Sequence, residues 1–277
     1  MPEYESAMAL IGDAELRSDG LGSAMGILVV EGPDDKRAFL PHVAHSSQIV
    51  PAGGRRLLLS AHEKMSTEYR SRIIFVTDCD YEVRRGALVG AKDLVITRFT
   101  DLESDLIGLG VVENLAIELI PRALSSQEEL ERISSSIHKK AQAISCPLGR
   151  IRMAAQPLGV PLGLDKLKIH NYWNRVNAEF DFAKVISALH TKVAAHVTAE
   201  AWKELVLSMP DDDGMCHGKD LVRSLALILK QDYGVDISGD EIARMMRMSL
   251  REDSMKKWDV ARRIRDWEEA NGRRVLK

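Results

Sequence analysis

Three carboxylates stand where apolar runs of the sequence stop. Glu31 follows Ile27–Val30, and Asp78 and Asp80 follow Ile73–Val76. Side chains two residues apart in an extended segment point the same way, so Asp78 and Asp80 can face one site. Like charges held so close repel each other unless a cation lies between them. The pattern therefore predicts a cation site, and for the turn at Glu31 the alternative is a solvated acidic turn.

A third acidic pair follows a further apolar run. Asp101 and Glu103 come shortly after Leu94–Thr97, and the eight histidines of the chain are scattered without ligand spacing. Carboxylate oxygens are hard ligands, which favour Mg²⁺ or Mn²⁺ over zinc. We expect three principal metal ligands, Glu31, Asp78 and Asp80, and three further ligands, Asp35, Asp101 and Glu103.

Such a site suits the cleavage of a phosphodiester bond. One or two divalent ions activate water, neutralise the phosphate and stabilise the leaving oxygen. Lys36 or Arg37, just after the first acidic turn, is placed to stabilise the phosphate. No Ser-His-Asp or Cys-His arrangement stands out as a competing catalytic group. We therefore assign catalysis to Glu31, Asp78, Asp80 and Lys36.

Parallel strands are the elements that must position these residues. Apolar runs and helical patterns alternate along the first 100 or so residues with short links, which indicates parallel pairing and right-handed crossovers. The carboxyl ends of such strands open onto one edge, where ligands bind in open α/β sheets. The predicted strands are 27–30, 47–52, 73–76 and 94–97, and the predicted helices between them are 34–44 and 55–69.

The second half is expected to be mainly helical. Apolar spacing predicts a helix over 105–121, and the Gly- and Pro-containing segment 147–167 is predicted to be a loop. The fold class is therefore α/β followed by a helical part. We place the boundary between a catalytic domain, residues 1–122, and a helical domain, residues 123–277.

The charge of the chain is uneven. The net charge is −3, but from Arg244 onward 11 basic residues face 6 acidic ones, a local balance of +5. A basic end beside an acidic catalytic half is compatible with nucleic acid, whose affinity for proteins comes mainly from phosphate neutralisation. Solvated helix faces are the alternative. Tyr172 and Trp173 either stack on a base or anchor the helical domain.

The last predicted helix carries an apolar stripe made of Val260, Ile264 and Trp267. Such a stripe is ordinary for a helix that packs against a core. We expect it to pack against the helical domain.

A nucleotide-binding loop is excluded. Lys219 is followed by Asp220 instead of Ser or Thr, and Gly214 is one residue too close to Gly218 for the Walker pattern. Any ATPase activity would have to come from a partner. His217, Lys219 and Asp220 remain candidates for a place near the substrate.

Membrane and disulfide classes are not indicated. No apolar run is long enough to span a bilayer, and the first residues lack a basic segment followed by an apolar one, so we expect a cytoplasmic protein. Cys79, Cys146 and Cys216 are odd in number and lack Cys-x-x-Cys spacing. We therefore expect neither a disulfide framework nor a zinc site.

The sequence VVEGPDD, with DCD downstream, resembles the TOPRIM domain of topoisomerases, primases and several nucleases. It is close to the form in small ribosomal-RNA maturases and overcoming-lysogenization-defect nucleases. The motifs DLE, Asp101 to Glu103, and HGKDL, from His217, resemble a narrower family. Its best-known members are the effector nucleases of the two-gene PARIS anti-phage system.

These resemblances imply a Rossmann-like TOPRIM fold and a Mg²⁺-dependent endonuclease that is a toxic anti-phage effector. They also imply that Glu31 acts as a general acid or base, that RNA (transfer RNA) is the target, that an ABC-type ATPase restrains the protein, and that it dimerises. The alternatives are a ribosomal-RNA maturase, a DNA-cleaving TOPRIM nuclease and a non-catalytic regulatory subunit.

Overall fold

The computed structural model describes residues 4–45, 48–120 and 126–277. It is an α/β structure that divides into two compact units. The first unit comprises Met1–Arg98 and Leu250–Lys277, and the second comprises Phe99–Ser249. The predicted boundary at residues 122 and 123 lies outside the described residues, and neither unit begins or ends there.

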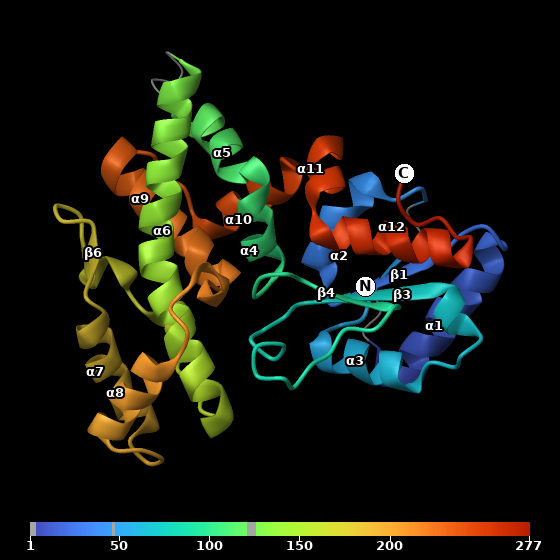
Figure 1. The fold of residues 1–277 in the computed structure, drawn as a ribbon, viewed down its shortest axis with the longest axis horizontal. Helices are drawn as coiled ribbons and strands as arrows, with labels where there is room; N and C mark the ends of the chain where they lie inside the picture. The colour runs from blue at the N-terminus through green and yellow to red at the C-terminus, as the bar shows by residue number, and fades with distance from the viewer. Residues whose placement is uncertain (1–3, 46–47, 121–125) are drawn as a thin grey trace. The chain divides into compact units, whose positions relative to one another are not determined.

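The first unit is built on a four-stranded parallel sheet (Figure 1). The strand order is β2-β1-β3-β4, so β1 and β3 are the two central strands. All residues of the four strands are buried, as expected for a parallel sheet covered on both faces. The strands are β1 (Ile27–Val30), β2 (Ile49–Pro51), β3 (Ile73–Thr77) and β4 (Leu94–Ile96), which confirms the predicted strands.

Helices cover both faces of this sheet. Figure 1 shows α1 (Ala7–Leu21) and α3 (Arg55–Lys64) on one side, and α2 (Pro33–Phe39) and α12 (Asp259–Asn271) on the other. On the first side, alternate strand residues such as Val29 and Phe75 join Leu10 and Leu58 of the helices in one hydrophobic cluster. This layered burial holds the strand ends in fixed register, which decides where their acidic residues lie.

The C-terminal segment belongs to the first unit. The stripe on α12 is buried, with Ile264 fully covered and Trp267 3% exposed. Trp258, just before α12, stacks on Phe39 of α2 with ring centroids 5.1 Å apart. The expectation that this stripe packs in the helical domain is therefore wrong. A periodic stripe shows that a helix is covered, but it does not identify the surface that covers it.

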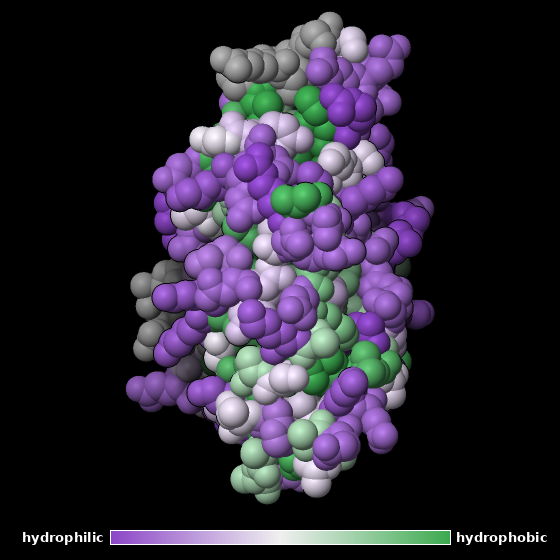
Figure 2. Space-filling view, turned by 90° about the vertical axis from the view of Figure 1, so that its left-hand side faces the viewer, coloured by the Kyte–Doolittle hydropathy of each residue, from purple (hydrophilic) through white to green (hydrophobic). Residues whose placement is uncertain are grey.

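The second unit is mainly helical, with one short hairpin. Figure 2 shows a face of the molecule on which polar side chains predominate and hydrophobic ones form smaller separate patches. Its helices and strands are α4 (Leu102–Leu106), a π-helical turn (Ile107–Val111), α5 (Val112–Leu119), α6 (Gln127–Ala155), β5 (Trp173–Asn174), β6 (Glu179–Phe180), α7 (Phe182–Val193), α8 (Ala199–Ser208), α9 (Gly218–Tyr233) and α10 (Gly239–Met248). The short α11 (Glu252–Lys257) precedes α12 in the first unit.

Two local predictions in this unit are corrected. α6 continues through Pro147 to Ala155, where a loop was expected, since Leu148 and Ile151 are fully buried and their packing offsets the loss of a helical hydrogen bond at proline. The helix predicted over 105–121 is interrupted, because Gly110 has a φ of 79° inside the π-helical turn. In the described part of both units, no helix is long and apolar enough to cross a bilayer.

Tyr172 and Trp173, the two aromatic residues considered for stacking on a base, take part in packing in this structure. Trp173 is 7% exposed, and Tyr172 meets Phe180 edge to face with ring centroids 6.5 Å apart. Buried indole surface is unavailable for stacking on a base. Trp173 therefore fits the anchoring alternative.

The expectation that the chain has no disulfide is wrong. Cys146 of α6 and Cys216, which precedes α9, form a disulfide, while Cys79 is free and buried. Their sequence separation is 70 residues, so spacing in the chain gave no sign of the pairing. The disulfide does not favour a cytoplasmic location, which stays a prediction, because disulfides persist mainly in oxidising compartments.

Breaking this disulfide is expected to destabilise the protein. Closing a loop of this length contributes roughly 4 kcal/mol in the chain-entropy model. Dithiothreitol and the Cys216→Ser variant should both lower the midpoint of thermal unfolding, and dithiothreitol should not lower the midpoint of Cys216→Ser further. The Cys79→Ala variant should keep the response to reductant. An unfolding midpoint of wild type that dithiothreitol leaves unchanged would contradict this expectation.

Candidate functional site

Glu31 lies at the junction of the two central strands. Parallel pairing sets Val30 beside Val76, so Glu31 follows β1 where Thr77 ends β3. Glu31 Oε1 accepts hydrogen bonds from Thr77 Oγ1 at 2.5 Å and from the Asp78 amide at 2.8 Å. The side chain is 17% exposed. The carboxylate is therefore fixed and partly accessible at the carboxyl edge of the sheet, the edge at which open α/β sheets bind ligands.

The turn after β2 holds the same residue from the other side. The amides of Gly53 and Gly54 donate to the Glu31 main-chain carbonyl at 3.1 and 2.9 Å. Gly54 has a φ of 127°, a conformation that side-chain-bearing residues rarely adopt. This glycine turn starts α3 beside Glu31, so Arg55, the first residue of α3, reaches the carboxylates at the ends of β1 and β3. We call these carboxylates, Glu31, Asp78, Asp80 and Glu82, the acidic edge.

Arg55 contacts the acidic groups at the ends of β1 and β3. Its Nη1 lies 3.9 Å from Glu31 Oε1 and donates to Asp80 Oδ2 at 3.3 Å. It also donates to the main-chain carbonyl of Asp78, and Nη2 donates to Glu82 Oε2 at 2.8 Å. Sequence reasoning missed both Arg55 and Glu82. A basic residue directly after a glycine turn at the same sheet edge was the available signal.

The turn after β3 differs from the extended segment on which the prediction relied. Asp80 and Tyr81 have φ values of 45° and 69°, in the left-handed region. Tyr81 is buried, and the Cys79 amide donates to Thr97 Oγ1 at 2.9 Å. The extended geometry from which the pairing of Asp78 and Asp80 was predicted is therefore not present at Asp80. They share Arg55, through the main chain of one and the side chain of the other.

Asp35 and Lys36 are engaged in local structure. Asp35 Oδ2 accepts from the Gly32 amide at 2.7 Å, which caps α2. Lys36 Nζ lies 3.4 Å from the carbonyl of Ile49, the first residue of β2. The acidic edge lies at the opposite, carboxyl end of the strands. The structure therefore gives no support to the predicted role of Lys36 at the phosphate.

Asp101 and Glu103 belong to the second unit and have partners there. Asp101 is 5% exposed and caps α4, accepting from the Ser104 amide at 3.0 Å and from its hydroxyl at 2.7 Å. Asp101 also accepts from the Gly218 amide at 2.7 Å. Glu103 forms an ion pair with Arg247 at 3.0 Å. Both carboxylates therefore stabilise this unit.

The DLE and HGKD motifs thus pack against each other. His217 Nδ1 lies 3.3 Å from Asp101 Oδ2, and the Ser104 hydroxyl donates to the Cys216 carbonyl at 2.9 Å. Asp220 is fully buried in an ion pair with Arg152 at 2.7 Å. A buried and paired carboxylate of this kind supports packing, so Asp220 does not fit a place near a substrate.

The six predicted ligands are therefore divided between the units. Glu31, Asp35, Asp78 and Asp80 are in the first unit, and Asp101 and Glu103 are in the second. Within residues 4–45, 48–120 and 126–277, no three His, Cys, Asp or Glu side chains are grouped as a ready-made metal site. The acidic oxygens of Glu31, Asp80 and Glu82 lie within 3.9 Å of one guanidinium group. This donor set is of the hard oxygen type that suits Mg²⁺ or Mn²⁺.

A separate ionic cluster lies at the amino ends of the strands. Asp93, just before β4, pairs with Arg70 at 2.8 Å and with His62 at 3.2 Å. A cavity of about 660 Å³ beside it is also lined by Arg263 and Trp267 of α12. Burial disfavours the charged form of Asp93, but the hydrogen bond and charge of His62 and the charge of Arg70 outweigh burial and lower its pKa. We interpret this cluster as support for the sheet.

The lowered pKa of Asp93 predicts a pH dependence of stability. A carboxylate with a depressed folded pKa stabilises the protein above the ordinary Asp pKa of about 4 and loses this contribution as pH falls through the folded value. Asp93→Asn should therefore lower the free energy of unfolding most at pH 6, and the difference from wild type should shrink below about pH 4. Urea unfolding over this pH range measures the difference. A difference independent of pH would contradict the charge-based account.

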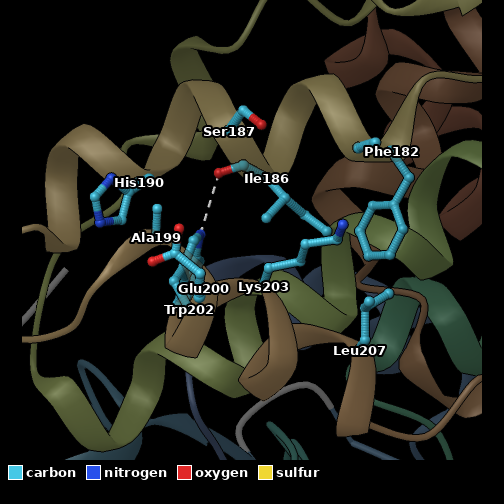
Figure 3. Close-up of a pocket in the computed structure, with 10 residues that line it drawn as sticks. Phe182, Ile186, Ser187, His190, Ala199, Glu200, Trp202, Lys203 and Leu207 are labelled. Carbon is cyan, nitrogen blue, oxygen red and sulfur yellow. Dashed lines mark hydrogen bonds between the residues drawn. The ribbon is translucent and has the colours of Figure 1, made fainter.

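A cavity of about 390 Å³ lies between α7 and α8 (Figure 3). Phe182 and Ile186 of α7 and Trp202 of α8 line it, and Trp202 Nε1 donates to the Ile186 carbonyl at 3.1 Å. His190, at one side, contacts the Val197 carbonyl at 3.1 Å. None of the predicted site residues lines this cavity, so it is a gap in helix packing without an assigned role.

The close contact between the DLE and HGKD motifs leaves no room for a side chain at Gly218. A Cβ atom there would lie 2.5 Å from Asp101 Oδ1 and 2.6 Å from Glu103 Cβ. Gly218→Ala should therefore destabilise the protein by about 1–3 kcal/mol, measured by urea unfolding. Gly12→Ala is the control, since Gly12 lies on α1 with open space around it. That change should stabilise by about 0.5–1 kcal/mol. Equal effects of the two changes would contradict the close packing.

Comparison with known proteins does not assign the chain to a family. No protein-family model matches it, and no curated protein matches it either.

Proposed function

We propose that this chain is a divalent-metal-dependent nuclease of the TOPRIM type. One observation carries the proposal. Glu31 is fixed at the carboxyl end of β1, beside the end of β3, and lies against the same guanidinium group, that of Arg55, as Asp80. A set of carboxylates built around a cation is what metal-assisted phosphodiester cleavage needs.

The topology of the first unit supports this proposal. Glu31 follows one central strand of a parallel sheet, and Asp78 and Asp80 follow the other. The resemblance of VVEGPDD and DCD to TOPRIM domains implies this placement of the acidic residues. Both motifs therefore lie at the sheet edge where open α/β sheets bind ligands.

Glu31, Asp78 and Asp80 would hold Mg²⁺ or Mn²⁺. The ion, when bound, supplies charge stabilisation to the phosphate and acidifies a bound water. Thr77 and the Asp78 amide keep the Glu31 carboxylate in place, and Glu31 is positioned to accept or return a proton at Oε2 or Oε1. Asp101 already accepts hydrogen bonds from Ser104 and Gly218, so it is a weaker candidate for a metal ligand than the sequence alone suggested.

The substrate and biological role are proposed from the narrower resemblance. The DLE and HGKD motifs that carry it pack together in the second unit, which supports treating them as one structural feature. We propose an anti-phage effector that cleaves RNA, with transfer RNA favoured, that is restrained by an ABC-type ATPase and that dimerises when active. Cleavage of DNA or of ribosomal-RNA precursors, or loss of catalysis with retained partner binding, are the competing outcomes.

The test is cleavage of total transfer RNA, single-stranded RNA and plasmid DNA by the purified protein with Mg²⁺ or EDTA. Glu31→Gln should lower Mg²⁺-dependent cleavage by about 10²-fold or more, because it removes a metal ligand and a proton acceptor. Asp34→Asn is the matched control, since Asp34 lies on the same turn and pairs with Arg37 at the surface. It should retain activity.

Two results would contradict the proposal. The first is cleavage that persists in EDTA or in Glu31→Gln. The second is a wild type that neither cuts any of the three substrates nor becomes toxic on expression in a Glu31-dependent manner.

A further inference from the structure

Arg55 is the positive charge at the centre of the acidic edge. Its side chain is 15% exposed, and its guanidinium contacts Glu31, Asp80 and Glu82 at 3.9, 3.3 and 2.8 Å. The three carboxylates would repel one another without it. Arg55 therefore supplies to these carboxylates the positive charge that a metal ion would supply if it were bound.

The contacts of Arg55 differ from those of a fully satisfied structural arginine. Its Nε is buried and has no hydrogen-bond partner. Its contact with Glu31 is longer than a hydrogen bond, whereas Arg152 binds Asp220 with two bonds of 2.7 and 3.0 Å. An unsatisfied buried donor costs free energy, and the contact with Glu31 is held by charge alone, whereas Asp78, Asp80 and Glu82 accept hydrogen bonds from the guanidinium. Such an arginine can be displaced by a stronger cation.

The position of Arg55 in the chain also permits displacement. It is the first residue of α3 and follows Gly53 and Gly54, whose φ values of 86° and 127° form the turn. The side chain can swing outward from this end without breaking hydrogen bonds inside the helix.

We infer that Arg55 is an internal counter-ion that competes with the divalent cation for Glu31 and Asp80. Metal binding displaces the guanidinium from these carboxylates. When no metal is bound, Arg55 keeps the acidic edge folded. This inference rests on the proposed metal site, and it assigns Arg55 to positioning and regulation of that site. It predicts that removing the charge strengthens metal binding, the opposite of what loss of a supporting residue would do.

The experiment measures Mn²⁺ affinity of the full chain by the electron paramagnetic resonance signal of free Mn²⁺, without any nucleic acid. Arg55→Met should bind Mn²⁺ about five- to tenfold more tightly than wild type, since one competing unit charge near 4 Å is removed. Arg56→Met is the matched control, because Arg56 is the exposed neighbour on α3. It should bind Mn²⁺ like wild type.

Thermal unfolding gives a second readout. Without metal, Arg55→Met should unfold at a lower temperature than wild type, since Glu31, Asp80 and Glu82 then lose the guanidinium that they share. Saturating Mn²⁺ should raise the unfolding temperature of Arg55→Met more than that of wild type. If Arg55→Met does not fold, Arg55→Lys replaces it, because one ammonium cannot contact three carboxylates as the guanidinium does. Its Mn²⁺ affinity should then exceed that of wild type.

Three results would overturn the inference. The first is Mn²⁺ binding by Arg55→Met that is equal to or weaker than that of wild type, or the same result for Arg55→Lys if Arg55→Met does not fold. The second is an equal rise in the Mn²⁺ affinity of Arg56→Met, and the third is a wild type that does not bind Mn²⁺. The proposed nuclease function fails separately. Tighter Mn²⁺ binding by Arg55→Met in a protein that cuts no nucleic acid would support the role of Arg55 and reject the cleavage reaction.

Discussion

The arrangement of the first unit depends on parallel pairing between β1 and β3. This pairing sets the end of β1 beside the end of β3, so Glu31 accepts from Thr77 and from the Asp78 amide. Because the strands are buried on both faces, the register cannot slip without exposing apolar residues. The acidic edge is therefore a consequence of core packing, and its mutual repulsion is offset by the charge of Arg55.

The second unit uses the same residue type for a different purpose. Asp101 is a carboxylate that follows an apolar run, as Glu31 is, yet it is almost fully buried and accepts from Ser104 and Gly218. Gly218 allows this approach because it lacks a Cβ. The contrast shows that burial and available donors decide whether a carboxylate at such a place supports the fold or faces a ligand.

Prediction from sequence succeeded where the signal was local. Unbroken runs of β-branched and aliphatic residues located β1 and β3. Prediction failed where distant residues decided the outcome. Pro147 was read as a loop residue, but it lies within α6, since burial of the residues that follow outweighs its local cost. The disulfide of Cys146 and the packing of α12 on the first unit were also invisible to periodicity.

The sequence by itself determined the parallel α/β character of the first unit and the acidic residues at its strand ends, because strand patterns and strand-terminal residues are local properties of the chain. Only the tertiary structure decided which carboxylates share an environment. It joined Glu31, Asp80 and Glu82 through Arg55, and it placed Asp101 and Glu103 in the packing of the second unit. Contacts of this kind depend on where separate elements meet in space, which residue order does not specify.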